Sequence, residues 1–236
     1  MSYQWEWEVF LRDDGSGRTY LEWMFSAWGW TLSVSACAWI VALAFGSLIG
    51  TLRTVPPRGW RRLGDAWVEL FRNVPLLVQI FLWYHVVPAI IPAFKDLPTF
   101  VLVVFALGFF TSARVAEQVR AGIQSLARGQ GLAGQALGLT LPQTYRYVIL
   151  PMAFRIVIPP LTSEAMNIIK NSSVAFAVSV SEMTLFALQA QEETARGIEI
   201  YLAVTALYAV SAFAVNRVMA WIERRVRVPG TIGGGR

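Results

Sequence analysis

Seven polar side chains that could act on a small solute lie within or beside long apolar segments of the sequence. Two of these residues follow one apolar run, and five interrupt another: Arg114, Glu117, Glu164, Asn167, Lys170, Asn171 and Ser172. An ionised or strongly polar group is costly to place in an apolar medium unless it has a partner or a task. We therefore regard these residues as candidates for lining a pathway that a polar solute follows.

The charged candidates also have neighbours at helical spacing. Arg114 and Glu117 are three residues apart, as are Glu69 and Arg72, and such residues can pair on one face of a helix. We expect the Glu69–Arg72 pair to anchor its helix near one membrane surface. For Arg114 two interpretations remain open. It pairs structurally with Glu117, or it binds a carboxylate of the transported solute.

A segment at 156–180 is apolar but interrupted. Glu164, Asn167 and Lys170 follow one another at one-turn intervals and could line one face of a helix. We expect Pro159-Pro160 and Asn171-Ser172-Ser173 to break this helix at its entry and near its middle. Irregular backbone at membrane depth is tolerated only where protein or a watery cavity covers it. Broken spans of this kind often form gates and substrate sites.

The elements that hold these residues are membrane helices. The chain has 236 residues, of which 56% are apolar and 15% are charged, whereas a soluble domain carries about 25% charged residues. A bilayer core is crossed by about 20 apolar residues. The sequence predicts an all-α membrane protein of about five transmembrane helices, at 31–52, 74–91, 98–113 with an extension to about 120, 156–180, and 201–216 with an extension to about 221.

Composition also argues against several classes of protein. The single cysteine, Cys37, cannot form an internal disulfide or a thiolate metal cluster, and the single histidine, His85, gives no histidine-based metal site. No GxxxxGK[ST] loop is present, so we expect no ATP binding by this chain itself. The basic residues form no long arm for a nucleic acid. We predict a protein that is not an enzyme and binds no cofactor or metal.

The basic residues are distributed unevenly along the chain. Fourteen of the 20 fall in three groups, at 53–65, 114–155 and 217–236. The positive-inside rule places these groups in the cytoplasm, with the N-terminus outside and the C-terminus inside. We expect an interfacial, extracytoplasmic segment at 1–26 that is not a signal peptide, a transmembrane domain at 27–222, and a cytoplasmic tail at 223–236.

A loop of about 30 residues, at 121–150, lies between the third and fourth predicted spans. Glycines and prolines punctuate short apolar clusters in it: Gly122, Gly129, Gly131, Gly134, Gly138, Pro142 and, just beyond, Pro151. Loops of this length without secondary structure are uncommon. The loop is therefore expected to contain one or two short helices whose small-residue face docks on a partner.

The same loop resembles the cytoplasmic loop of ABC importer permeases. That motif reads EAA, three residues, G, nine residues, I, one residue, LP. Gly138 falls on its glycine, Val148 on its isoleucine, and Leu150 and Pro151 on its last two positions. Leu132, Ala133 and Gly134 stand where the motif has EAA, so its acidic residue is missing. The resemblance implies that this loop couples the permease to an ATPase.

Segments on either side of this loop resemble a narrower group within the ABC importer permeases. Residues 68–79 are similar to the second-span signature of polar amino-acid permeases, and Lys170-Asn171-Ser172 to their broken fourth span. Residues 111–120, 141–147 and 221–230 are similar to permeases for the acidic amino acids glutamate and aspartate.

The resemblance implies the arrangement of type I (MetI-like) ABC importer permeases in a bacterial inner membrane. It implies four kinds of partner: the membrane, a second similar permease chain, two ATPase subunits that use ATP, and an external amino-acid-binding protein. No nucleic acid is implied. The alternative, from the residues alone, is a secondary transporter or channel subunit for a small polar solute.

Overall fold

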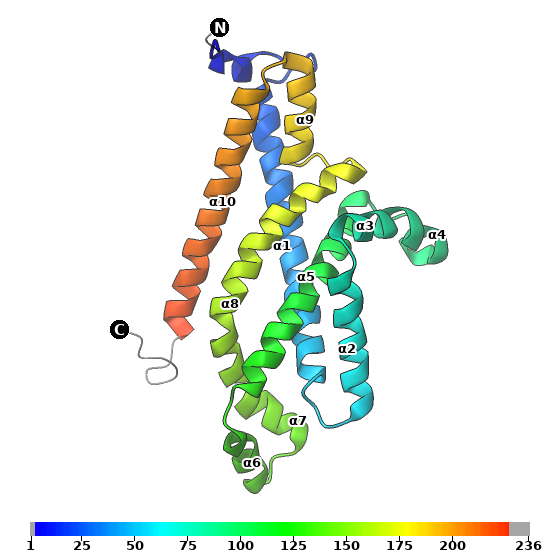
Figure 1. The fold of residues 1–236 in the computed structure, drawn as a ribbon, viewed down its shortest axis with the longest axis vertical. Coiled ribbons are helices and arrows are strands. Elements are labelled where there is room, and N and C mark those ends of the chain that lie inside the picture. The colour runs from blue at the N-terminus through cyan, green and yellow to red at the C-terminus, as the bar shows by residue number, and fades with distance from the viewer. Residues whose placement is uncertain (1–2, 227–236) are drawn as a thin grey trace.

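A computed structural model describes residues 3–226, and within that range the regular structure is helical (Figure 1). The α-helices are α1 (Tyr20–Leu52), α2 (Arg58–Asn73), α3 (Leu76–Phe81), α4 (Val87–Ile90), α5 (Thr99–Gln124), α6 (Arg128–Ala136), α7 (Leu141–Thr144), α8 (Leu150–Asn171), α9 (Met183–Thr194) and α10 (Gly197–Val226). The predicted tail at 223–236 lies outside the described residues beyond position 226.

Four of the predicted spans are confirmed as long apolar helical segments. They are α1, α5, the run Leu141–Val178 that contains α8, and α10. Several of the observed helices are longer than the predicted spans, because polar first and last turns extend each helix beyond its apolar core. α1, for example, begins at Tyr20 with a capping box in which Thr19 and Glu22 satisfy each other's backbone N–H groups.

The span predicted at 74–91 covers only the second half of a bent helical pair. α2 and the helical run Leu76–Ile90 meet at a bend of 105°, and only together do they have the length and composition of a span. Val74 is extended and Pro75 follows it, as expected because a residue before proline avoids the helical region. In Figure 1, α3 and α4 turn away from the axis along which α2 runs.

The expected break at Pro159-Pro160 is also wrong. α8 continues as a helix through both prolines, which are exposed on its surface. The change expected after Asn171 is confirmed: α8 ends there, a 3-10 segment (Ser172–Val178) follows, and Ser179 adopts a left-handed conformation with φ of 58°. The irregular backbone therefore begins at Ser172, the last of the polar candidates, and not at the prolines.

Helices α1 and α5 form the closest-packed pair in the fold. Gly46 and Gly50 of α1 face Val115 and Val119 of α5, and Gly108 of α5 faces Val41 of α1. A side chain at any of these three glycines would collide with the opposite helix. Small residues at such positions let two membrane helices approach closely, and this contact fixes the position of Arg114, which lies between Gly108 and Val115 on α5.

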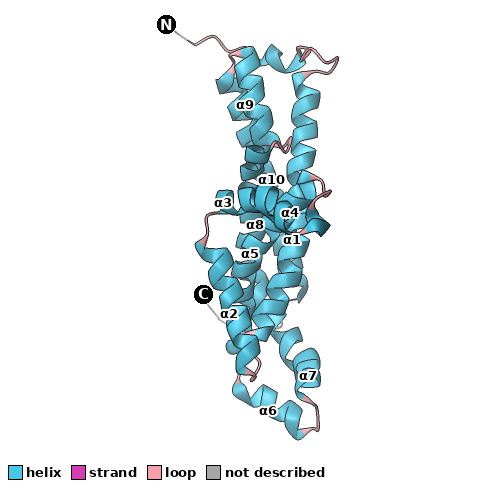
Figure 2. Ribbon diagram, turned by 90° about the vertical axis from the view of Figure 1, so that its right-hand side faces the viewer, coloured by secondary structure: helices cyan, strands magenta, loops and turns pink. Residues whose placement is uncertain are grey.

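The two ends of the molecule carry different segments. α6 and α7 lie at one end of the long axis, and the N-terminal segment with α9 lies at the other (Figures 1 and 2). The N-terminal segment is tied to the start of α10: the hydroxyl of Tyr3 donates to Glu199 at 2.5 Å, and Glu6 forms ion pairs with Arg12 and Arg196. The N-terminal segment and the loop at 121–150 thus lie at opposite ends of the fold.

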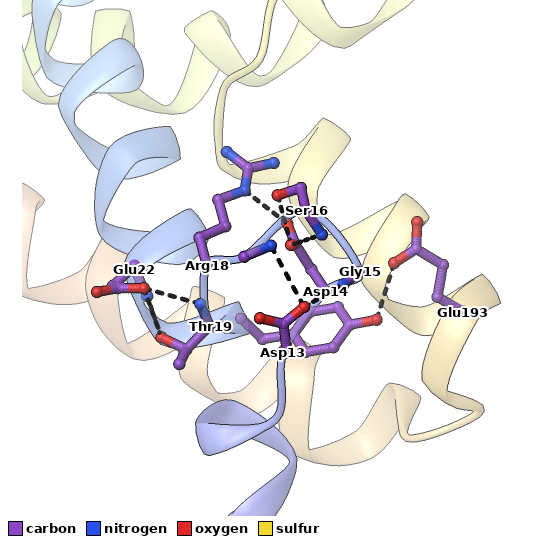
Figure 3. Close-up of polar contacts among 10 residues, drawn as sticks. Asp13, Asp14, Gly15, Ser16, Arg18, Thr19, Glu22 and Glu193 are labelled. Atoms are coloured by element: carbon purple, nitrogen blue, oxygen red, sulfur yellow. Dashed lines mark hydrogen bonds and ion pairs between the residues drawn. The ribbon is translucent and has the colours of Figure 1, made fainter.

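A tight polar turn precedes α1 (Figure 3). The Asp13 carboxylate accepts backbone N–H bonds from Gly15 and Gly17, and Asp14 accepts from Ser16 and pairs with Arg18 at 2.5 Å. Hydrogen bonding by Ser16 and then the Arg18 guanidinium lower the pKa of Asp14 from 3.8 to about 2. The aromatic N-terminal segment thus ends in an ordered turn directly before the first membrane helix.

Candidate functional site

Arg114 lies on α5 opposite Glu164 of α8, and these two residues form the centre of the candidate site. The Arg114 Nη1 atom is 3.7 Å from Glu164 Oε2. The Glu164 Oε1 atom accepts a 3.5 Å hydrogen bond from the side-chain amide of Gln118, one turn further along α5. The predicted Arg114–Glu117 pair is wrong, because Glu117 points toward another helix.

The contact between Arg114 and Glu164 leaves hydrogen-bonding capacity unused. A separation of 3.7 Å is too long for a hydrogen bond, and Glu164 Oε2 is buried without a hydrogen-bond partner among the described residues. The guanidinium lies over the ring of Phe110, with Cζ 4.8 Å from the ring centroid. The Arg114 side chain is 39% exposed, whereas the Glu164 side chain is 12% exposed. Arg114 thus has free N–H donors on an accessible side.

Glu117 pairs with Arg72 and not with its helical neighbour. The Arg72 Nη1 atom is 2.5 Å from Glu117 Oε1, which joins α2 to α5. The predicted Glu69–Arg72 pair is therefore wrong. Both partners are well exposed, so this ion pair contributes little to stability. Its effect on the site is to withdraw Glu117 from Arg114.

The remaining polar candidates lie further along α8 and do not join this cluster. Lys170 is exposed and forms no ion pair within residues 3–226, and Asn167 and Asn171 are partly exposed. Ser172 is buried, and its hydroxyl donates to the carbonyl of Ile169 at 2.7 Å. Glu164 and Lys170 thus have different surroundings, and the structure does not gather the predicted row of side chains into one site.

The predicted coupling loop contains two short helices, α6 and α7, as expected. Leu132 and Ala133 are exposed on α6, as is Leu137 directly after it. Gly134 is buried against α7, where an added Cβ would lie 3.0 Å from the Thr144 methyl carbon. The loop therefore presents apolar side chains outward on a folded helical hairpin.

Gly138 ends α6 with a left-handed turn. Its φ is +81°, its N–H donates to the carbonyl of Gln135 at 2.9 Å, and the N–H of Leu139 donates to the carbonyl of Gly134 at 3.1 Å. This double hydrogen bond is the Schellman pattern, in which glycine is preferred because other residues are strained there. The chain therefore turns tightly at Gly138.

We expect Gly138→Ala to impair coupling of transport to ATP hydrolysis. The alanine should cost about 1 kcal/mol in the left-handed region and shift the direction in which α6 meets α7. Gly129→Ala is the matched control, because Gly129 lies in α6 with nothing within 4 Å of an added Cβ. Uptake and substrate-stimulated ATP hydrolysis are the measurements. Equal effects of the two substitutions would contradict a role for the turn.

Leu150 and Pro151 begin α8 beside the loop. Leu150 packs against the apolar cluster that joins α5, α8 and α10, and Pro151 is exposed in the first turn. The helical run is continuous from Leu141 to Val178, and Pro151 follows a π-helical turn (Tyr145–Ile149), where the regular backbone hydrogen-bond pattern is already interrupted. These two residues thus connect the predicted coupling loop directly to the helix that carries Glu164.

Three polar residues that the sequence pattern did not indicate lie at interfaces in the fold. Gln118 joins the Arg114–Glu164 cluster, and its position one turn after Arg114 was the available signal. Asp65 accepts from Arg53 Nε at 2.7 Å, and it is the one acid among the arginines of its segment. Glu182 is fully buried and caps α9 by accepting the N–H groups of Thr184 and Leu185. Among residues 3–226, no group of three or more potential metal ligands is found.

The helical fold and the polar cluster define a membrane transport component, and comparison with known proteins shows which family it is. A family model described as the binding-protein-dependent transport system inner membrane component matches residues 42–228. The chain belongs to this family. It is a membrane permease component without catalytic activity, and ATP hydrolysis in such systems belongs to a separate subunit.

Two relatives come from Escherichia coli O6:H1 strain CFT073. The glutamate/aspartate import permease protein GltJ is 46% identical over 99% of this chain and 100% of its own length. The glutamate/aspartate import permease protein GltK is 28% identical over 83% of this chain and 89% of its own length. The first similarity extends over nearly the whole chain, and the second over most of it.

A solved structure supports the same fold. The crystal structure of an amino acid ABC transporter with histidines contains a chain that is 30% identical to this one, with a TM-score of 0.76. The alignment covers 87% of this chain and 95% of that chain. The all-helical permease arrangement predicted from the sequence is therefore confirmed.

Proposed function

We propose that this chain is a permease subunit of an ATP-driven importer for the acidic amino acids glutamate and aspartate. The observation that carries the proposal is the 46% identity to the glutamate/aspartate import permease GltJ over the full length of both chains. The polar cluster on α5 and α8 supplies a chemical reason for such a specificity.

Arg114 is the proposed determinant of selectivity for an acidic side chain. A substrate carboxylate in a path of low dielectric needs a fixed cation or strong donors. A guanidinium can hold a carboxylate with two parallel hydrogen bonds. Arg114 has such donors available, because its contact with Glu164 is long and Glu117 pairs with Arg72 instead. Glu164, Asn167, Lys170, Asn171 and Ser172 are proposed to line the path on the α8 side.

The proposed partners follow from the loop and the family. A second, similar permease chain would complete the path, as the pair of related permeases GltJ and GltK suggests. Two ATPase subunits would dock on the loop, and its exposed Leu132 and Leu137 suit a protein contact. An external amino-acid-binding protein would deliver the substrate to the end formed by the N-terminal segment and α9.

The proposed orientation in the inner membrane has the N-terminus outside and the C-terminus in the cytoplasm. We expect a cysteine at Ser16 to react with an impermeant thiol reagent in intact cells, and a cysteine at Gln135 to react only after lysis. Both positions are exposed in the structure, and both variants would be made in a Cys37→Ala background. The opposite labelling pattern would contradict this orientation.

A cellular experiment tests the substrate. Cells lacking this chain should lose high-affinity uptake of radiolabelled glutamate, and the wild-type chain should restore it. Unlabelled aspartate should compete with the restored uptake, whereas glutamine at the same concentration should not. Restored uptake that glutamine suppresses as well as aspartate does would contradict selectivity for acidic amino acids.

A further inference from the structure

A cavity of about 450 Å³ lies at the end of the molecule that carries α6 and α7, away from the Arg114 cluster. Its walls come from the inner ends of α1, α2 and α5 and from the loop at 121–150. Three of the lining side chains are arginines: Arg53, Arg61 and Arg120. The volume is within the range of small-molecule sites in proteins.

Two of the three cations share one carboxylate. Arg53 Nε lies 2.7 Å from Asp65 Oδ1, and Arg120 Nη1 lies 3.9 Å from the same oxygen. Arg61 forms no ion pair within the described part of the chain. The cluster therefore carries an excess of about two positive charges, because an arginine side chain stays protonated in proteins.

Two of the guanidinium groups have donors that no atom of residues 3–226 satisfies. Arg53 is 7% exposed, and its Nη1 atom is buried without a hydrogen-bond partner. The Nε atom of Arg120 is likewise buried without a partner. A buried donor left unpaired is costly, and both side chains line the same cavity. An anion that entered the cavity would meet three arginine side chains that only one carboxylate balances.

The backbone is shaped to hold Arg53 in this position. An added Cβ at Gly64 of α2 would lie 2.5 Å from the Arg53 Cγ atom, so only a glycine leaves room for the arginine stem. The hydroxyl of Tyr145 donates to Thr54 Oγ1 at 3.2 Å, which ties the loop to the turn after α1. These two contacts shape the cavity and do not depend on the arginines' charge.

We propose that this cavity binds a phosphate group that bridges the inner ends of α1, α2 and α5 to the loop at 121–150. Arginine forks match the oxygens of a phosphate, and an excess of two charges suits an anion of this class. The group could belong to the headgroup of an anionic phospholipid, since the cavity lies where two membrane helices end, or to soluble phosphate. Its role would be to brace the loop against the membrane helices.

Arg61→Gln is the informative variant, because Arg61 lines the cavity but is exposed and makes no ion pair on which folding would depend. Arg62→Gln is the matched control: it removes the same charge from the next residue, which is exposed and does not line the cavity. The importer purified with its co-expressed partner chains would be used for both. Equal thermal unfolding midpoints without added anion would establish that both variants fold.

Two probes separate the sources of phosphate. In the first arm, equilibrium binding of radiolabelled inorganic phosphate is measured in detergent, with chloride holding the ionic strength constant. In the second arm, the importer is placed in nanodiscs of phosphatidylcholine with or without phosphatidylglycerol. The importer is then released from the nanodiscs, and the lipid that stays bound to it is identified by native mass spectrometry. The wild type, Arg61→Gln and Arg62→Gln importers contain the same ATPase subunits, so any binding of phosphate to those subunits is the same in all three.

We expect Arg61→Gln to weaken binding by roughly tenfold or more in one arm, since it removes a charge-assisted hydrogen bond, while Arg62→Gln matches the wild type. Weaker binding by Arg61→Gln than by the wild type in the first arm identifies a soluble phosphate site. Weaker binding by Arg61→Gln in the second arm alone identifies a lipid headgroup site. The proposal is overturned if neither probe distinguishes wild type from Arg61→Gln, or if Arg62→Gln weakens binding equally.

Discussion

Replacing Arg114 by glutamine should lower glutamate uptake by roughly 10- to 150-fold, the range for loss of a charge-assisted hydrogen bond of about 1.5–3 kcal/mol. Arg114→Lys should lower uptake less, because an ammonium keeps the charge but cannot form two parallel hydrogen bonds to a carboxylate. The loss should be in transport and not in the amount of assembled importer. Initial uptake rates against glutamate concentration, together with the quantity of complex in the membrane, are the measurements.

A structural role of Arg114 predicts a different pattern. The arginine also neutralises Glu164, which is 9% exposed, and an unpaired carboxylate left there would be destabilising. The double variant Arg114→Gln with Glu164→Gln removes both charges and should recover any stability lost in the single variant. If Arg114 binds substrate, the double variant is stable but still transports glutamate poorly. Recovery of uptake in the double variant would show that the arginine serves only to balance Glu164.

Replacing Gly46 by alanine should weaken the contact between α1 and α5 by about 1–3 kcal/mol, the usual cost of overpacking a close-packed interface. The added Cβ would lie 2.5 Å from Val115 and 2.9 Å from the carbonyl oxygen of Ser112. A backbone oxygen cannot move aside as a side-chain end can, so the helices must separate. We expect lower membrane levels and a lower thermal unfolding midpoint by tryptophan fluorescence.

Gly29→Ala is the control for this substitution. Gly29 lies on the same helix, is exposed, and has nothing within 4 Å of an added Cβ. Because alanine favours helix more than glycine does, its effect should be neutral or stabilising by up to about 1 kcal/mol. If Gly46→Ala has an unfolding midpoint as high as that of Gly29→Ala, the inference that α1 and α5 pack closely at Gly46 is contradicted.

Apolar periodicity was sufficient to predict most of the membrane helices, because length and hydropathy decide whether a segment can span a bilayer. It failed at 74–91, where Val74 and Pro75 turn the chain by 105° and divide one span between two helices. It also failed at Pro159-Pro160, since a helix can continue through prolines at its exposed surface when its neighbours hold it. Local composition does not show which of these outcomes tertiary packing favours.

The candidate site was predicted less completely than the fold. Its central residues Arg114 and Glu164 were identified because charges in apolar segments are rare, but their pairing was not. Spacing along one helix suggested Arg114–Glu117 and Glu69–Arg72, whereas the structure pairs Arg114 with Glu164 and Arg72 with Glu117. Contacts between helices depend on which faces meet, and that information is absent from spacing within a single helix.

Transport by the purified importer in proteoliposomes tests the proposed function most directly. The complex containing this chain would be reconstituted with ATP inside or outside the vesicles, the external binding protein added, and uptake of radiolabelled glutamate and glutamine compared. We predict glutamate uptake that requires ATP hydrolysis on the side of the 121–150 loop and exceeds glutamine uptake at least about tenfold, as expected for a carboxylate held by a guanidinium. Uptake that proceeds without ATP, or that favours glutamine, would contradict it.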